Sequence, residues 1–154
     1  EWGKFSARLL VSELAGGDAE LDVLAAPLLD RTSSARDRLT ATALLMRRLE
    51  GLSPEAAAPM VELLCSRVLR ESDEAARLAA VSTLGRAPGG RRRLGALDAV
   101  LRRDASAGCR LWAVRGLAET TGALAGEARA LLEAAQATET DESVLEALEQ
   151  ALGP

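Results

Sequence analysis

The stretch Asp73–Gly85, DEAARLAAVSTLG, decides the fold of this chain. Asp73 suits a helix N-cap, because its carboxylate can accept hydrogen bonds from the unpaired backbone N–H groups of a first helical turn. At 100° per residue the apolar side chains gather in one arc around Arg77, which comprises Leu78, Ala80, Val81, Leu84 and Gly85. The stretch therefore predicts an amphipathic helix with one buried side.

Weaker copies of this stretch recur along the chain. Arg38 lies 39 residues before Arg77, Arg110 lies 33 residues after it, and apolar residues follow each arginine at the same places. A fourth copy lies 35 residues further on, with Asp141 in the position of Asp73. A period in this range is typical of stacked supersecondary units, each of which buries its apolar face against its neighbours.

The shared pattern, D-x-x-x-R-x-x-A-(A/V)-x-x-L-G, resembles the second helix of a HEAT repeat, and the resemblance covers about residues 19–153 in four units. It implies an all-α fold, a right-handed α-α superhelix. Two units depart from the pattern. In unit three Cys109 precedes the arginine and the nearest acid, Asp104, comes two residues early, whereas unit four has Leu145 in place of the arginine. An atypical last unit is expected of an end cap.

We expect residues 1–154 to form one domain, in which a helix at 4–14 precedes four helix pairs. These pairs are expected at about 19–50, 53–87, 90–121 and 123–153. The helix at 4–14 has no partner and the chain begins with Glu1. We therefore expect a piece of a longer array. No segment alternates with period two, so we expect no strands.

Composition narrows the possible functions. Apolar residues make up 48% of the chain and aromatic residues only 2%, which predicts a core of Leu, Ala and Val. The absence of histidine removes the usual acid/base group at neutral pH and the commonest metal ligand. Two cysteines are too few for a disulfide framework or a four-ligand zinc site. We therefore expect a non-catalytic protein without a cofactor.

The sequence shows no signal peptide and no apolar run near the roughly 20 residues that span a bilayer. This favours a cytoplasmic location and no membrane partner. The net charge is −4, but it is unevenly distributed, because residues 67–115 carry +6 and residues 116–154 carry −7. Such a dipolar chain orients charged partners without identifying them.

Three arginines, Arg38, Arg77 and Arg110, lie in the middle of apolar arcs. A buried guanidinium requires carboxylates or carbonyls, because an unpaired buried charge costs several kcal/mol. Asp37, Asp73 and Asp104 are the partners that the sequence suggests. In HEAT proteins such residues form a ladder between neighbouring repeats, so the resemblance implies a structural role for Arg38, Asp73, Arg77 and Arg110.

Trp112 lies opposite the core of its helix pair, where the other units have only the small residues Thr40, Ala79 and Ala147. It is either an interface anchor or a residue that packs between repeats. Five charged residues project from the same side, namely Arg36, Arg47, Arg86, Arg115 and Glu119. In a right-handed stack this side lines the concave groove. Our main hypothesis is a scaffold whose basic groove binds an acidic helix or extended segment of another protein, and the alternative for this side is a solvated face.

A second cluster surrounds the first helix of unit three and consists of Arg91, Arg92, Arg93, Arg102 and Arg103. Such a cluster can hold phosphates, so a nucleic-acid-binding module is the second hypothesis. HEAT-like proteins similar to the alkylpurine glycosylases depend on aromatic and basic residues that line a groove, and this chain has too few aromatic residues to match them. The iron-binding deoxyhypusine hydroxylases use histidines, which are also absent here. A third hypothesis is an accessory or regulatory domain of a larger enzyme. Partner identity, pathway and oligomeric state, monomer or otherwise, stay open.

Overall fold

The computed structural model describes residues 19–153, so the helix expected at 4–14 lies outside the described residues. Its elements, in chain order, are α2 (Ala19–Leu29), α3 (Ala35–Leu49), α4 (Pro54–Val68), α5 (Glu74–Arg86), α6 (Arg91–Arg103), α7 (Ala107–Ala118), the short 3-10 helix η1 (Gly122–Leu124), α8 (Ala125–Gln136) and α9 (Glu142–Leu152). No strand occurs within this range, which confirms the all-α expectation.

The helix starts follow local capping chemistry. Side chains of Ser34, Ser53, Asp73, Ser106 and Asp141 each accept a hydrogen bond from a backbone N–H two or three residues further on. Asp73 is thus the N-cap of α5, as its sequence position predicts. The start of α4 is reinforced by a proline in its first turn, where the missing N–H leaves no intrahelical bond unmade.

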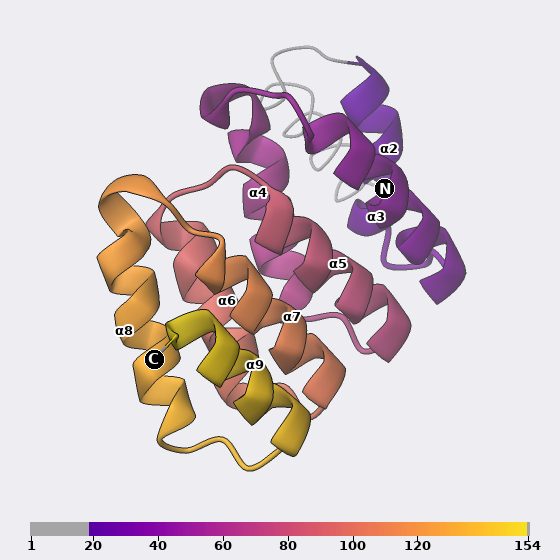
Figure 1. The fold of residues 1–154 in the computed structure, drawn as a ribbon. Helices are drawn as coiled ribbons and strands as arrows, with labels where there is room; N and C mark the ends of the chain where they lie inside the picture. The colour runs from indigo at the N-terminus through magenta and orange to yellow at the C-terminus, as the bar shows by residue number, and fades with distance from the viewer. Residues whose placement is uncertain (1–18, 154) are drawn as a thin grey trace.

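Helices pack as consecutive pairs, α2 with α3, α4 with α5, α6 with α7 and α8 with α9. The second helices α3, α5, α7 and α9 contact one another in that order, and the first helices α4, α6 and α8 do the same behind them (Figure 1). The buried core between the two layers is made of Leu, Val and Ala, with Met60 and the two cysteines. Each pair thus depends on its neighbours for part of its burial.

Three ion pairs of the same design join successive helix pairs. Arg38 binds Glu71 with nitrogen–oxygen distances of 2.7 and 2.9 Å. Arg77 binds Asp104 at 2.7 and 3.0 Å. The third pair joins Arg110 to Glu139, at 2.9 and 3.1 Å. In each, two parallel N–H···O bonds link the second helix of one pair to the turn before the second helix of the next. We call this set the arginine ladder.

The ladder corrects the carboxylates suggested by the sequence. Asp37 bonds the hydroxyl of Ser34, and Asp73 caps its own helix. Asp104 is a ladder carboxylate, but it binds the arginine of the preceding unit. The physical reason is the position of the arginine side chain relative to the next helix pair. Each second helix packs beside the turn of the following pair, and that turn brings a carboxylate to the guanidinium.

Each ladder carboxylate also holds its own turn. Glu71, Asp104 and Glu139 accept a hydrogen bond from the backbone N–H two residues further on, at 3.1, 2.9 and 2.9 Å. The bond from Arg38 is the largest of the effects that lower the pKa of Glu71 to about 2, although burial of this carboxyl acts in the opposite direction. The ladder therefore fixes both the turns and the spacing between pairs.

Candidate functional site

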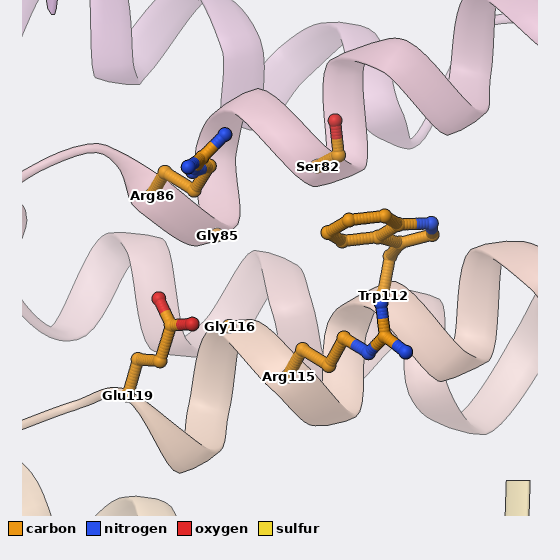
Figure 2. A pocket seen from close by; sticks show the side chains of 7 residues that line it. All are labelled: Ser82, Gly85, Arg86, Trp112, Arg115, Gly116 and Glu119. Carbon is orange, nitrogen blue, oxygen red and sulfur yellow. The ribbon is translucent and has the colours of Figure 1, made fainter. Parts of the chain in front are cut away.

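The outward face of the second-helix layer carries a pocket between α5 and α7. Its volume is about 450 Å³, and its lining consists of Ser82, Gly85, Arg86, Trp112, Arg115, Gly116 and Glu119 (Figure 2). We call it the Trp112 pocket. Ser82, Gly85 and Arg86 come from α5, whereas the other four residues come from α7 and its C-cap. The ladder bonds lie at the starts of α5 and α7, and the pocket lies toward their ends.

Two glycines form the base of the pocket and bring the two helices together. A Cβ atom built on Gly116 would lie 2.7 Å from the Cα of Gly85, and one built on Gly85 would lie 3.1 Å from the Cα of Gly116. No larger side chain fits at Gly116 without moving a backbone. The close approach therefore requires glycine at this crossing, and it leaves backbone as the base of the pocket.

A buried arginine stabilises the helix ends beside this base. Arg93, at the start of α6, donates hydrogen bonds to the carbonyl oxygens of Leu84, Gly85 and Gly116. It also donates to the hydroxyl of Thr120, at 3.1 Å. Its side chain satisfies carbonyls at the ends of α5 and α7 that have no partner within their helices. Burial lowers the pKa of this guanidinium.

Trp112 forms one wall of the pocket. Figure 2 shows its indole rising from α7 toward Ser82 of α5, with Arg115 lying against it. The guanidinium carbon of Arg115 is 4.8 Å from the centre of the ring, a cation–π contact that holds both side chains in place. The ring is half-buried, since it packs against the core on one side and lines the pocket on the other. The contact with the core agrees with the packing interpretation of Trp112, and its role as an interface anchor stays a prediction.

The rim of the pocket is charged and exposed. Arg86, Arg115 and Glu119 have no ion-pair partner among residues 19–153. A nitrogen of Arg86 lies 3.9 Å from the sulfur of Met46 on α3, so this side chain reaches away from Glu119 (Figure 2). Two exposed guanidiniums beside an aromatic ring can receive a carboxylate and the apolar group that carries it.

The structure brings together four of the six residues that the sequence suggested for partner binding, namely Arg86, Trp112, Arg115 and Glu119. Arg36 and Arg47 are exposed on α3, outside the pocket. Sequence reasoning missed Ser82, Gly85 and Gly116. A signal for the glycines existed, because two glycines in the second helices of adjacent units indicate a close helix crossing.

The second arginine cluster does not form one surface. Arg93 is buried, with 5% of its surface exposed, so its assignment as a phosphate ligand is wrong. Three of the others are engaged with carboxylates: Arg91 with Glu127, Arg92 with Glu62, and Arg102 with Asp98. Arg103 is exposed at the end of α6. The positive charge expected there is largely compensated by neighbouring acids.

Other reactive groups in the described range are enclosed or dispersed. Cys65 and Cys109 are buried, and burial raises the pKa of both thiols, that of Cys65 to about 11. Between residues 19 and 153 no group of three or more Cys, Asp or Glu side chains is placed to hold a metal ion. In the same range, no helix has the length and apolar character needed to cross a membrane.

Comparison with known proteins gives no relative for this chain, because no protein-family model, curated protein or solved structure matches it.

Proposed function

We propose that this chain is a non-catalytic scaffold, a HEAT-like right-handed superhelix that binds a segment of another protein across the concave face of its second helices. The observation that carries the proposal is the Trp112 pocket. A half-buried indole stands beside Arg86 and Arg115, and neither arginine has a carboxylate partner in the described chain. Tryptophan and arginine are the residue types most enriched at binding hot spots.

The contrast with the other arginines supports this assignment. Arg38, Arg77 and Arg110 are each bound by two parallel bonds to a largely buried carboxylate. Those arginines have their charges satisfied within the fold, and the pocket arginines do not. An acidic segment would supply the carboxylates that the pocket lacks.

Rigidity supports the proposal as well. The ladder fixes the spacing of the helix pairs, and Arg93 binds carbonyls from both α5 and α7. The pocket is therefore formed before any partner arrives, which lowers the conformational entropy lost on binding.

The test is an affinity capture with the full chain, comparing wild type with Trp112→Ala. The matched control is Leu69→Ala, which removes another exposed apolar side chain, 52% accessible, from the end of α4 in the other layer. We expect that a protein retained by wild type is also retained by Leu69→Ala but is no longer retained by Trp112→Ala. If wild type and Trp112→Ala retain the same proteins in the same amounts, the proposed function is wrong.

A further inference from the structure

Three charged residues occupy the same position in successive units, and the third has the opposite charge to the first two. Arg47, Arg86 and Glu119 each come nine residues after a ladder arginine, at the ends of α3, α5 and α7. All three are exposed, and none forms an ion pair within residues 19–153. We call them the charge row, which reads positive, positive, negative.

The members of the charge row are neighbours across the second-helix layer. Helices α3, α5 and α7 pack side by side in that order. The side chain of Arg86 reaches Met46, the residue next to Arg47. On the other side, Arg86 and Glu119 line the same pocket. The row therefore crosses three helix pairs and borders the pocket that Trp112 also lines.

The spacing of the row selects a conformation for its partner. Adjacent packed helices have axes roughly 8–10 Å apart. A segment in the polyproline II conformation has three residues per turn and rises about 3.1 Å per residue, so every third side chain lies on one side, about 9.3 Å from the last. A β-strand would turn every third side chain to the opposite face. Aromatic-lined grooves are also the usual docking sites of polyproline II segments.

Resting on the proposed function, we propose that the bound segment is extended in the polyproline II conformation and carries an acid, an acid and a base at three-residue intervals. The two acids face Arg47 and Arg86, and the base faces Glu119. Residues between the second acid and the base contact Trp112. Glu119 excludes a uniformly acidic segment, because a third acid would face a carboxylate.

The experiment is a selection from a displayed library of random twelve-residue peptides against the immobilised full chain at low salt, where exposed charges are least screened. Wild type, Glu119→Arg and Trp112→Ala are compared after thermal melts verify their folding. Wild type is expected to enrich acid-x-x-acid-x-x-base in either chain direction. Glu119→Arg is expected to enrich an acid at the third place. A peptide selected on wild type should bind wild type roughly fivefold to tenfold tighter than it binds Glu119→Arg, and a peptide selected on Glu119→Arg should show the reverse preference.

Failures of the two proposals are distinguishable. Peptides that need Trp112 but show no charge pattern, or that ignore Glu119→Arg, overturn the charge row and leave the proposed function standing. A pattern with acids seven residues apart indicates a helical partner and overturns the extended conformation. If no selected peptide depends on Trp112, the proposed function fails and the inference fails with it.

Discussion

Replacing Arg77 with alanine tests whether the ladder holds the stack together. In the native structure its guanidinium makes two bonds to Asp104 and a third, at 3.0 Å, to the carbonyl of Glu71. The side chains of Arg77 and Asp104 are only 16% and 6% exposed. Arg77→Ala leaves this largely buried carboxylate without its cationic partner and removes the ladder bonds between the second and third helix pairs.

The magnitude follows from burial. Removing one partner of a buried ion pair costs about 3–5 kcal/mol, because the remaining charge stays desolvated. Since Arg77 keeps some contact with water, we expect the lower end, about 3 kcal/mol. For a chain of this length each kcal/mol lowers the melting temperature by about 2–4 °C, so the expected decrease is about 6–12 °C.

The assay is thermal unfolding followed by far-ultraviolet circular dichroism at neutral pH. The matched control is Arg92→Ala, which breaks an ion pair with Glu62 whose side chains are 55% and 58% exposed. That exposed pair contributes about 0–1 kcal/mol, so the control should melt within a few degrees of wild type. Equal melting temperatures for Arg77→Ala and Arg92→Ala would refute the ladder as a stabilising element.

Other perturbations test the helix crossing, the ladder carboxylate and the buried arginine. Gly116→Ala should lower stability by about 1–3 kcal/mol, because its Cβ would lie 2.7 Å from a backbone atom of α5. Gly95→Ala, in open space on α6, should instead raise stability by up to about 1 kcal/mol; denaturant titrations compare the two. Because the pKa of Glu71 is lowered from 4.5 to about 2, its ionised form stabilises the fold above pH 4.5, and this contribution is lost as the pH falls toward 2. Urea titrations across this window should show a smaller pH dependence for Glu71→Gln than for wild type. Arg93→Ala should cost about 2 kcal/mol, since it removes the buried donors of three carbonyls, and only those of Leu84 and Gly116 keep another bond, from Ala87 N–H and from the Thr120 hydroxyl. Arg91→Ala, at an exposed neighbour, should melt like wild type.

The helix pairs could be predicted from the sequence because their signals are local. The proline- and glycine-rich loop before Arg91 and the period of the apolar side chains predict a helix at 91–103, and α6 has these bounds. Likewise Ser53 and the proline after it predict the start of α4. These signals depend on the hydrogen bonds and burial of a single helix, so no knowledge of the neighbouring units is needed.

The ladder partners could not be chosen by proximity in the chain, because each carboxylate comes from the following helix pair. A periodic signal was nonetheless present. Glu71, Asp104 and Glu139 stand 33 and 35 residues apart, the same offsets that separate the second, third and fourth units. Aligning acids as well as apolar residues between units would have found them.

The pocket and the buried arginine depend on details of packing. Three consecutive arginines begin α6, and only Arg93 faces the core, one turn before Leu97. A helical wheel of α6 places Arg93 on the apolar side of the helix, whereas the number of arginines in the segment does not distinguish Arg93 from its two neighbours. Trp112 and Arg115 could be placed on one face from the sequence, whereas the hollow beside them exists only because two glycines let α5 and α7 approach.

The most direct test of the binding account is the amide NMR spectrum of the full chain, titrated with a captured partner segment. The account predicts that the backbone signals of Ser82, Arg86 and Arg115 and the indole N–H signal of Trp112 all shift during the titration. Their shifts should reach half of their final values at the same concentration of the segment. Exposed residues of the opposite layer, such as Glu133 on α8, should keep their positions. Shifts confined to α4, α6 and α8, with the Trp112 indole signal unmoved, would contradict the assignment of the second-helix face as the binding surface.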